Sequence, residues 1–226
     1  MKYENVVEAC FINRPNRFIA NILVDGEEKV CHVKNTGRCK ELLAGKPTIY
    51  VQHFNTPTRK TAYDLITVQK GHRLINMDSV APNKVFGEYL SAGGLGFVPD
   101  YIKAESTHGD SRFDFYFEHD GKKAYAEVKG VTLEEDGVVR FPDAPTERGL
   151  KHLRGLMECV EQGFEAYAVF IIQMEDVKYF EPNYKTHEEF GLLLKEAQSK
   201  GVRIIAIDCH VTPDTLTAGK EVEIRL

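Results

Sequence analysis

Apolar and polar residues alternate with the two-residue period of β-strands in five short stretches of the first 70 residues. These stretches span residues 7–12, 17–24, 29–33, 48–52 and 63–69. Turn-forming residues separate them, at Gly26, Gly37, Gly45 and Pro57. Many short strands divided in this way predict a small barrel or a sandwich. The N-terminal part of the chain is therefore predicted to be all-β.

A short helix is predicted at residues 38–43, between the third and fourth of these strands. An OB-fold carries a helix at that place in the chain, and its strands form a partly open five-stranded barrel. The sequence therefore predicts an OB-like barrel domain over residues 1–80.

After residue 80 the pattern changes to helices that alternate with buried strands. Apolar residues at helical spacing predict helices at 83–92, 146–162 and 187–200. Unbroken apolar runs, which are typical of buried parallel strands, occur at 166–172 and 202–207, and shorter strands are predicted at 101–105, 138–141 and 215–225. Residues 81–226 are therefore predicted to form an α/β domain with a mixed sheet. No Gly/Ser-rich linker precedes it, so we expect the two domains to pack against each other.

The second domain contains a strong hairpin signal. Asp120-Gly121 separates two runs of strand-forming residues, 111–118 and 123–129, and Gly accepts the positive φ of a type I′ turn. A two-residue loop places Tyr116 opposite Tyr125, Asp114 opposite Glu127, and Arg112 opposite Lys129. These six residues are predicted to share one surface. The other surface is predicted to face the core and is formed by Phe113, Phe115, Phe117, Ala124, Ala126 and Val128.

Two opposed carboxylates destabilise a strand pair unless something compensates their charge. Arg112 and Lys129 could do so as an ordinary polar ladder. Alternatively, Asp114 and Glu127 bind a divalent cation, Mg²⁺ or Mn²⁺, which takes one or two protein carboxylates together with phosphate oxygens. Lys129 would then orient a water molecule or stabilise charge on the phosphate. Both interpretations remain open from the residues alone.

Asp followed by Glu-x-Lys on the next strand resembles the PD-(D/E)xK signature of restriction-endonuclease-like nucleases, although Phe113 replaces its Pro. Further matching segments lie at residues 35–38, 111–115, 127–133 and 141–154. Together they resemble the sugar fermentation stimulation protein A family over residues 14–209, with departures at Cys39 and Pro145. This resemblance implies an OB-like domain followed by a restriction-endonuclease-like domain, DNA binding, and nuclease activity.

The resemblance also implies further site residues. An acidic residue on the first helix of such a domain can join the metal site, which makes Glu88 a third candidate ligand, although an exposed helical Glu is more often simply solvated. The helix predicted at 146–162 is expected to lie beside the acidic pair. Lys151 is therefore predicted to be catalytic and Arg148 to contact a phosphate, whereas His152 fits a surface position as well as a functional one.

The net charge of −5 does not favour nucleic-acid binding, but the charge is unevenly distributed. Residues 1–80 carry 12 Lys and Arg against 8 Asp and Glu, a balance of +4, which leaves −9 for the remainder. Candidate phosphate contacts, each of which could instead be a solvated surface residue, are Arg17, Lys34, Asn35, Arg38, Arg59, Lys60 and Arg112. Phe18 and Phe54 are predicted to be core residues.

The five cysteines are dispersed and form no C-x-x-C pair, so neither a disulfide framework nor a zinc site is predicted. The sequence lacks a run of about 18 apolar residues, and we expect a cytoplasmic protein without a membrane segment. Three functions remain open: a metal-dependent nuclease, a non-catalytic DNA-binding regulatory protein linked to sugar metabolism, and a module that binds a nucleotide or small phosphate. The oligomeric state is not predicted.

Overall fold

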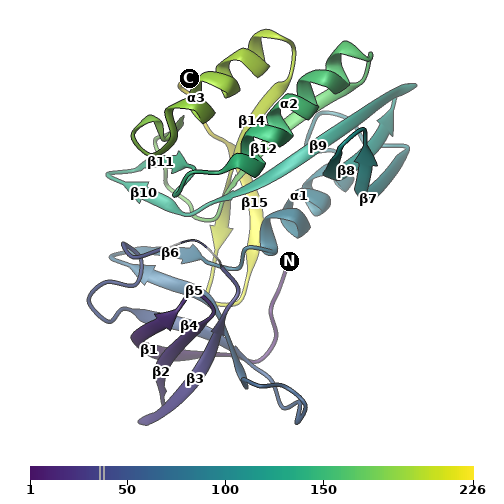
Figure 1. Cartoon of the computed structure of the whole chain (residues 1–226). Helices are drawn as coiled ribbons and strands as arrows, with labels where there is room; N and C mark the ends of the chain where they lie inside the picture. Colours follow the sequence, from purple (N-terminus) through teal and green to yellow (C-terminus); the bar gives the residue numbers. More distant parts are fainter. Residues whose placement is uncertain (36, 38) are drawn as a thin grey trace.

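The computed structural model describes residues 1–35, 37 and 39–226. Figure 1 shows two domains, with a barrel of strands below and a larger domain that carries the helices above. The N-terminal domain contains β1 (Val6–Asn16), β2 (Ile19–Val24), β3 (Glu27–Val33), β4 (Thr48–His53), β5 (Tyr63–Lys70) and β6 (Arg73–Asn76).

The strands β1 to β5 close into a barrel. β1 pairs antiparallel with β2 and β4, β2 pairs with β3, and β5 closes the ring by pairing with β4 and, in parallel, with β3. Ile22, Val51 and Leu65 point into the barrel and have no exposed surface, because the alternation that predicts the strands also fills the core. The predicted OB-like barrel is confirmed.

The helix predicted at residues 38–43 is not formed. The described residues 39–45 form turns, in which the Leu43 N–H donates to the Cys39 carbonyl oxygen at 3.3 Å. Cys39 has a φ of 45° and Gly45 a φ of 73°, values that an α-helix does not contain. So short a segment cannot offset the cost of helix nucleation. Arg38 itself lies outside the described residues.

The main sheet of the C-terminal domain has the strand order β15-β14-β12-β9-β8-β7. Its strands are β7 (Tyr101–His108), β8 (Ser111–His119), β9 (Lys122–Val131), β12 (Glu165–Ile172), β14 (Arg203–Val211) and β15 (Leu216–Glu221). β9, β12 and β14 are parallel, whereas β7, β8 and β15 pair antiparallel with their neighbours. A smaller sheet contains β10 (Leu133–Glu135), β11 (Val138–Phe141) and β13 (Tyr179–Pro182). The predicted mixed α/β sheet is confirmed.

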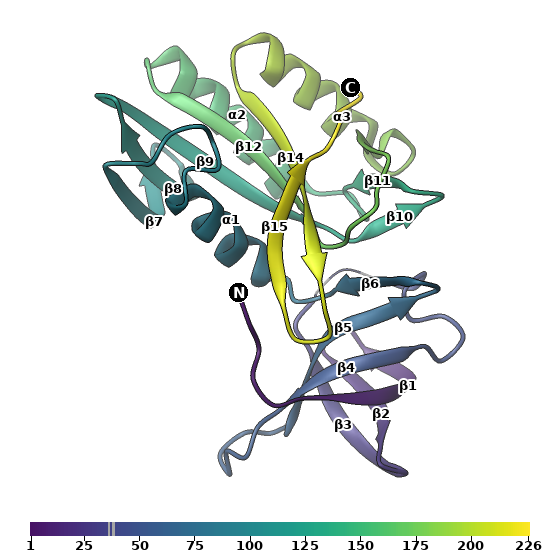
Figure 2. The ribbon, with the colours of Figure 1, turned by 180° about the vertical axis from the view of Figure 1, so that it is seen from behind.

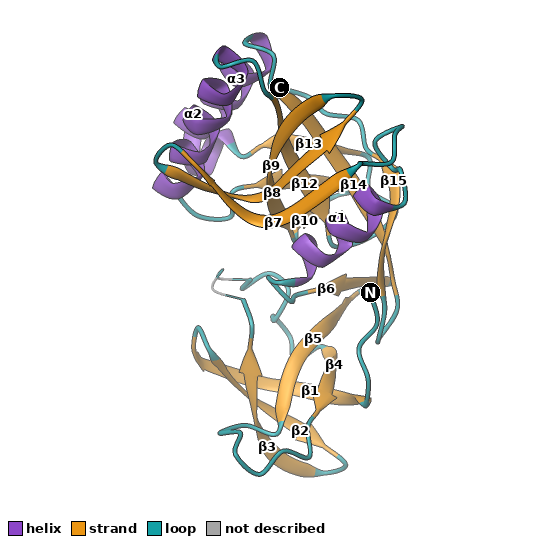
Figure 3. Cartoon of the chain, turned by 90° about the vertical axis from the view of Figure 1, so that its right-hand side faces the viewer, coloured by secondary structure: helices purple, strands orange, loops and turns teal. Residues whose placement is uncertain are grey.

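Helices cover both faces of the main sheet (Figure 3). α1 (Ala81–Ser91) packs Phe86 into a core with Phe117, while α2 (Glu147–Glu161) and α3 (Tyr184–Ser199) pack Leu153 and Phe190 into the core of the opposite face. β12 is buried on both faces, which explains its unbroken apolar run. A polar group inside this sheet therefore needs a partner within the protein.

Polar contacts fix the two domains against each other. The Asn76 N–H donates to the Gln173 carbonyl oxygen at 2.9 Å, and Gln173 Nε2 donates to Asn76 Oδ1 at 2.9 Å. The buried Glu134 carboxylate binds Lys70 at 2.7 Å and Arg73 at 2.9 Å, both from the barrel. The start of the chain also runs from the barrel to the beginning of β15 (Figure 2). The expectation that the domains pack together is confirmed.

In the described part of the chain, no helix has both the length and the apolar character needed to cross a membrane.

Glu165 ties the closed end of the β8–β9 hairpin to β12. Its carboxylate accepts hydrogen bonds from Tyr167 at 2.7 Å and Lys122 at 2.9 Å, and it contacts His119 Nε2 at 3.0 Å. Burial raises the pKa of Glu165, but these contacts and the Arg203 guanidinium outweigh it and lower that pKa to about 2.

We expect Glu165→Gln to lower the free energy of unfolding at pH 7 by about 1–2 kcal/mol, an estimate reduced for partial solvent screening. The folded pKa lies below the unfolded value of about 4.3, so the ionised carboxylate stabilises the fold above about pH 5 and loses its effect as pH falls toward about 2. The variant should therefore show a shallower loss of stability on acidification. Urea unfolding over this pH range measures both effects, and curves parallel to those of the parent protein would contradict the assignment.

Candidate metal and nucleic-acid site

The predicted hairpin forms with the predicted register at its closed end. β8 and β9 pair from the turn as far as Phe115 and Ala126. The ladder ends there, one residue before Asp114 and Glu127, although β9 stays paired with β12 as far as Val131. The hairpin therefore opens where the two acids lie. The direct cross-strand pair predicted for Asp114 and Glu127 is not formed.

β8 changes its orientation at this opening. Phe113 packs on the α2 side, with its ring centroid 6.2 Å from that of His152, whereas Phe115 packs on the α1 side. Residues two apart share a face in a regular strand, so the common face predicted for these two phenylalanines is wrong. Glu105 of β7, which would lie opposite Asp114, has a φ of 54°, and the regular pairing is interrupted at this point.

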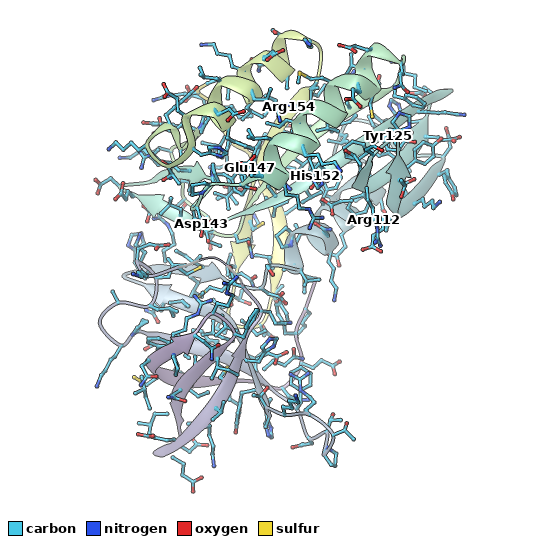
Figure 4. All side chains as sticks on the ribbon, viewed as in Figure 1. Arg112, Tyr125, Asp143, Glu147, His152 and Arg154 are labelled. Atoms are coloured by element: carbon cyan, nitrogen blue, oxygen red, sulfur yellow. The ribbon has the colours of Figure 1, made fainter. Side chains whose placement is uncertain are left out.

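Arg112 does not face Lys129 as predicted. Its guanidinium binds the carboxylate of Glu105 on β7, and both side chains are exposed. In Figure 4 Arg112 lies below and to the right of His152. Arg112 therefore does not compensate the acidic pair.

Asp114 occupies the open side of β9. Its Oδ2 accepts a hydrogen bond from the Val128 N–H at 2.8 Å, which takes the place of a ladder bond from β8. Its Oδ1 accepts a hydrogen bond from Asn83 Nδ2 of α1, also at 2.8 Å. Each carboxylate oxygen keeps a second lone pair, so both can still coordinate a cation.

Glu127 is buried, with 4% of its surface exposed. Lys129 Nζ donates to its Oε1 at 2.6 Å, and His152 Nδ1 of α2 contacts the same oxygen. Its Oε2 is buried and has no hydrogen-bond partner among the described residues. An unpaired buried carboxylate oxygen is costly, so this atom is the natural place for a further ligand.

The surroundings move the two acids in opposite directions. Burial, followed by the charge of Glu127, raises the pKa of Asp114, against the hydrogen bonds from Val128 and Asn83. Burial also raises the pKa of Glu127, but the hydrogen bond from His152 and the Lys129 ammonium outweigh it, so that this pKa is lowered. Paired carboxylates whose pKa values are pushed apart are common at functional sites.

His152, and not Lys151, is the α2 residue that reaches the acids. His152 is buried and touches Glu127, whereas Lys151 is exposed, and none of the contacts of the described residues joins it to either acid. Arg148 Nε lies 3.5 Å from His152 Nε2. A series of contacts thus runs from the exposed Arg148 guanidinium through His152 to Glu127. Arg148 therefore lies beside the site, and its phosphate contact and the catalytic role of Lys151 stay predictions.

Asn83, and not Glu88, is the α1 residue at the site. Glu88 is half exposed, and its carboxylate accepts a hydrogen bond from the N-terminal ammonium of Met1 at 2.7 Å. Five residues of a helix turn the chain by about 140° beyond one full turn, so the side chains of Asn83 and Glu88 cannot face the same way. The structure does not bring Glu88 to the acidic pair.

The donor set fits a hard divalent cation. Asp114 and Glu127 supply carboxylate oxygens, of which Glu127 Oε2 is unsatisfied, and such oxygens suit Mg²⁺ or Mn²⁺. Across the described ranges, no group of three or more His, Cys, Asp and Glu is arranged to hold a metal ion. An ion here would therefore take its other ligands from water and from a bound phosphate. A cavity of about 10 Å³ on the His152 side has no room for a hydrated ion.

Three of the predicted phosphate contacts of the barrel instead bind other groups of the protein. Lys34 binds the buried Asp78 at 2.7 Å, and Arg59 binds the buried Asp64 while its guanidinium lies 3.8 Å from the ring centroid of Phe54. Asn35 donates to the Met77 carbonyl oxygen at 3.0 Å and accepts from the Gly37 N–H at 2.7 Å. Lys34, Arg59 and Asn35 thus stabilise the barrel and its junction with the second domain.

Other basic residues of the barrel face solvent. Arg17 and Lys60 are exposed, and the Arg17 guanidinium lies 5.8 Å from the ring centroid of Phe18. Phe18 is 51% exposed, so its predicted core position is wrong. The described surface therefore offers an aromatic ring beside a cation at the turn between β1 and β2.

These features define a two-domain protein, in which an OB barrel is joined to a restriction-endonuclease-like α/β domain. In the second domain, two carboxylates and a lysine lie where a hairpin of the mixed sheet opens. A solved structure described as Pyrococcus furiosus SfsA in complex with Ca²⁺ has the same architecture. It is similar over 100% of this chain and 98% of its own, with a TM-score of 0.89 and 25% sequence identity.

Two family descriptions match the chain: the SfsA N-terminal OB domain over residues 12–77, and the sugar fermentation stimulation protein RE domain over residues 80–215. A sugar fermentation stimulation protein homolog of Desulfitobacterium hafniense is 57% identical over 226 residues, which is 100% of this chain and 99% of the relative. One of Clostridium beijerinckii is 53% identical over 100% of both chains. The chain therefore belongs to the sugar fermentation stimulation protein family.

Sequence reasoning missed Asn83 as a site residue and undervalued His152. Both lie on predicted helices, but the signals in the sequence were weak. His152 is flanked by the charged Lys151 and by Leu153, and only its position four residues before the buried Leu156 hints that it turns inward. Asn83 follows Pro82 at the start of α1, where a polar residue usually serves the helix end.

We expect His152→Ala to lower the free energy of unfolding by about 1–3 kcal/mol, because it removes a hydrogen-bond partner of a buried carboxylate. The pKa of Glu127 should rise toward its ordinary value at the same time, since one of the groups that lower it is lost. Urea unfolding checks the first effect, and His152→Gln, which can keep a donor, should recover part of it. Glu158→Ala, at an exposed position of the same helix, is the matched control. Equal stability of the two alanine variants would contradict the contact.

Proposed function

We propose that the protein is a metal-dependent phosphodiesterase that cleaves nucleic acid, DNA in particular, with Mg²⁺ or Mn²⁺ as cofactor. The observation that carries this proposal is the unsatisfied Oε2 of Glu127 beside Asp114, at the open end of the hairpin. A buried anionic oxygen without a partner persists in a fold when a ligand compensates it. The solved Pyrococcus furiosus relative is described as a complex with Ca²⁺, a cation that also prefers oxygen ligands.

The side chains support distinct tasks in this reaction. Asp114 and Glu127 would hold the ion, which when bound supplies a Lewis acid that polarises the phosphodiester. Asn83 and the Val128 N–H fix the orientation of the Asp114 carboxylate. Lys129, 20% exposed, holds Glu127 Oε1 and can place its ammonium against the anionic phosphate.

His152 and Arg148 contribute from the α2 side. His152 holds the same Glu127 oxygen as Lys129 and so directs Oε2 away from both donors. Arg148 is exposed beside His152, where its planar guanidinium suits a phosphate group. The arrangement thus supplies two anionic ligands for a cation and two cations for the substrate.

A second function, DNA binding without cleavage, is favoured by one specific observation. Lys129 and His152 already contact one oxygen of Glu127, so the carboxylate can be interpreted as part of a structural network. In that case the protein would be a DNA-binding regulatory protein linked to sugar metabolism, and the acids would only stabilise its fold.

The two functions differ in whether Asp114 and Glu127 are needed to cleave DNA. We expect single- or double-stranded DNA to be cleaved in the presence of Mg²⁺ or Mn²⁺ and to stay intact in EDTA. Asp114→Asn, Glu127→Gln and Lys129→Met should each slow cleavage by at least about 100-fold, because each removes a ligand or a charge at the phosphate. Gel analysis of labelled DNA measures the rates.

Glu158→Gln, which removes an exposed carboxylate from α2, is the control and should leave the rate within about twofold. Equal DNA binding by Asp114→Asn and the parent protein would show that the fold persists in the variant. If the parent protein binds DNA but cleaves none with either metal, the nuclease proposal fails and the binding function remains.

A further inference from the structure

A groove lies between the barrel and the loop that precedes α2. It encloses about 580 Å³, and its lining includes Phe11, Asn16, Arg17, Lys40, Leu43 and, from the second domain, Ala144. Neither Asp nor Glu is present among the described residues that line it. The groove thus combines positive charge with an apolar floor, since Phe11 and Leu43 are buried beneath it.

We infer that this groove binds one unpaired nucleotide of a single-stranded nucleic acid, and that it holds the strand whose phosphodiester reaches the acids. The inference rests on the proposed function, because it takes nucleic acid as the substrate. It adds the strandedness of that substrate and a second site of contact near the start of α2, the helix that carries His152.

Charge and shape favour a nucleotide as the occupant. Arg17 and Lys40 are exposed cations suited to a phosphate, and the apolar floor is suited to a base. Arg14 holds the wall of the groove, because its guanidinium donates to the carbonyl oxygens of Asn35 at 2.6 Å and of Gly37 at 3.0 Å. Arg14 thus ties Asn35 and Gly37 to the barrel strand β1 at the edge of the groove.

An exposed aromatic ring favours a single strand over a duplex. Phe18, 51% exposed, stands next to Arg17, and Asn16 Oδ1 accepts hydrogen bonds from the N–H groups of Phe18 at 2.9 Å and Ile19 at 3.1 Å. A ring of this kind can stack on a base only when the base is unpaired. A duplex presents mainly phosphates, which would leave the ring and the apolar floor without contacts.

The groove is connected to the acids by a short stretch of chain. Figure 4 shows Asp143 at the junction of the domains, with Glu147 and His152 following along α2. Ala144 and His152 are separated by two loop residues and five helical residues, a distance of at most about 18 Å. A stacked strand advances about 3.4 Å per nucleotide, so about five nucleotides span this distance.

Fluorescence anisotropy with labelled oligonucleotides in EDTA tests the inference without cleavage. We expect the full chain to bind a single strand of twelve nucleotides at least tenfold more tightly than a duplex of the same length. Affinity should increase from three to six nucleotides and change little beyond that, because about five nucleotides cover the groove and the acids. Equal affinity for the single strand and the duplex would overturn the inference.

Variants locate the binding on the protein. Arg17→Glu combined with Lys40→Glu should weaken single-strand binding at least tenfold, and Phe18→Ala should weaken it by about fivefold or more through lost stacking. Lys185→Glu combined with Lys195→Glu makes the same charge change at exposed positions of α3 and should have an effect of less than about twofold after correction for net charge. Equal weakening by both double variants would overturn the groove as the site.

The outcomes separate this inference from the proposed function. Groove-dependent binding of single strands without cleavage in Mg²⁺ or Mn²⁺ contradicts the nuclease and leaves the groove. Cleavage of duplex DNA that is unaffected by Arg17→Glu and Lys40→Glu contradicts the groove and leaves the nuclease. Absence of binding to every oligonucleotide contradicts both.

Discussion

The Glu127 carboxylate lies inside a sheet that helices cover on both faces, and much of the C-terminal domain is arranged around its charge. Burying an anion without partners would cost several kcal/mol, which is comparable with the whole free energy of unfolding of a domain. Lys129 of the same strand and His152 of α2 supply the compensation at one oxygen. The second oxygen has no hydrogen-bond partner within the described residues, so the fold holds an anionic atom ready for a ligand.

The contact of His152 with Glu127 ties α2 to the sheet, and the loop that precedes α2 reaches the barrel. α2 begins at Thr146, whose side chain caps the helix by accepting from the Gly149 N–H at 3.0 Å. The loop before it approaches the barrel so closely that a Cβ on Gly37 would lie 2.6 Å from Asp143 Oδ2. A basic groove on the barrel and an acidic pair in the sheet are thereby kept at a fixed separation.

The two acids of the site are made unequal by their surroundings. Asp114 receives hydrogen bonds from neutral donors, and burial together with the nearby Glu127 raises its pKa. Glu127 is more deeply buried, yet a lysine and a histidine keep its pKa low. Two like charges cannot both ionise easily at close range, and unequal partners resolve that conflict without a permanent ligand. Because the hairpin opens here, the Asp114 side chain accepts the hydrogen bond from the Val128 N–H that the β8 backbone would otherwise accept.

The sequence by itself determined most of the elements, because their signals are local: alternation gives the barrel strands, unbroken apolar runs give the parallel strands, and Asp120-Gly121 gives the closed end of the hairpin with its register. The helix predicted at 38–43 is the exception, since so short a segment depends on its surroundings. It also identified Asp114, Glu127 and Lys129 as a group. Only the tertiary structure decided which other residues join them. The side of the sheet that β8 faces changes at Phe113, Asn83 and His152 contact the acids, and Lys34 and Arg59 bind buried acids. These outcomes depend on which elements pack together, and a contact between residues far apart in the chain leaves no periodic trace in the sequence.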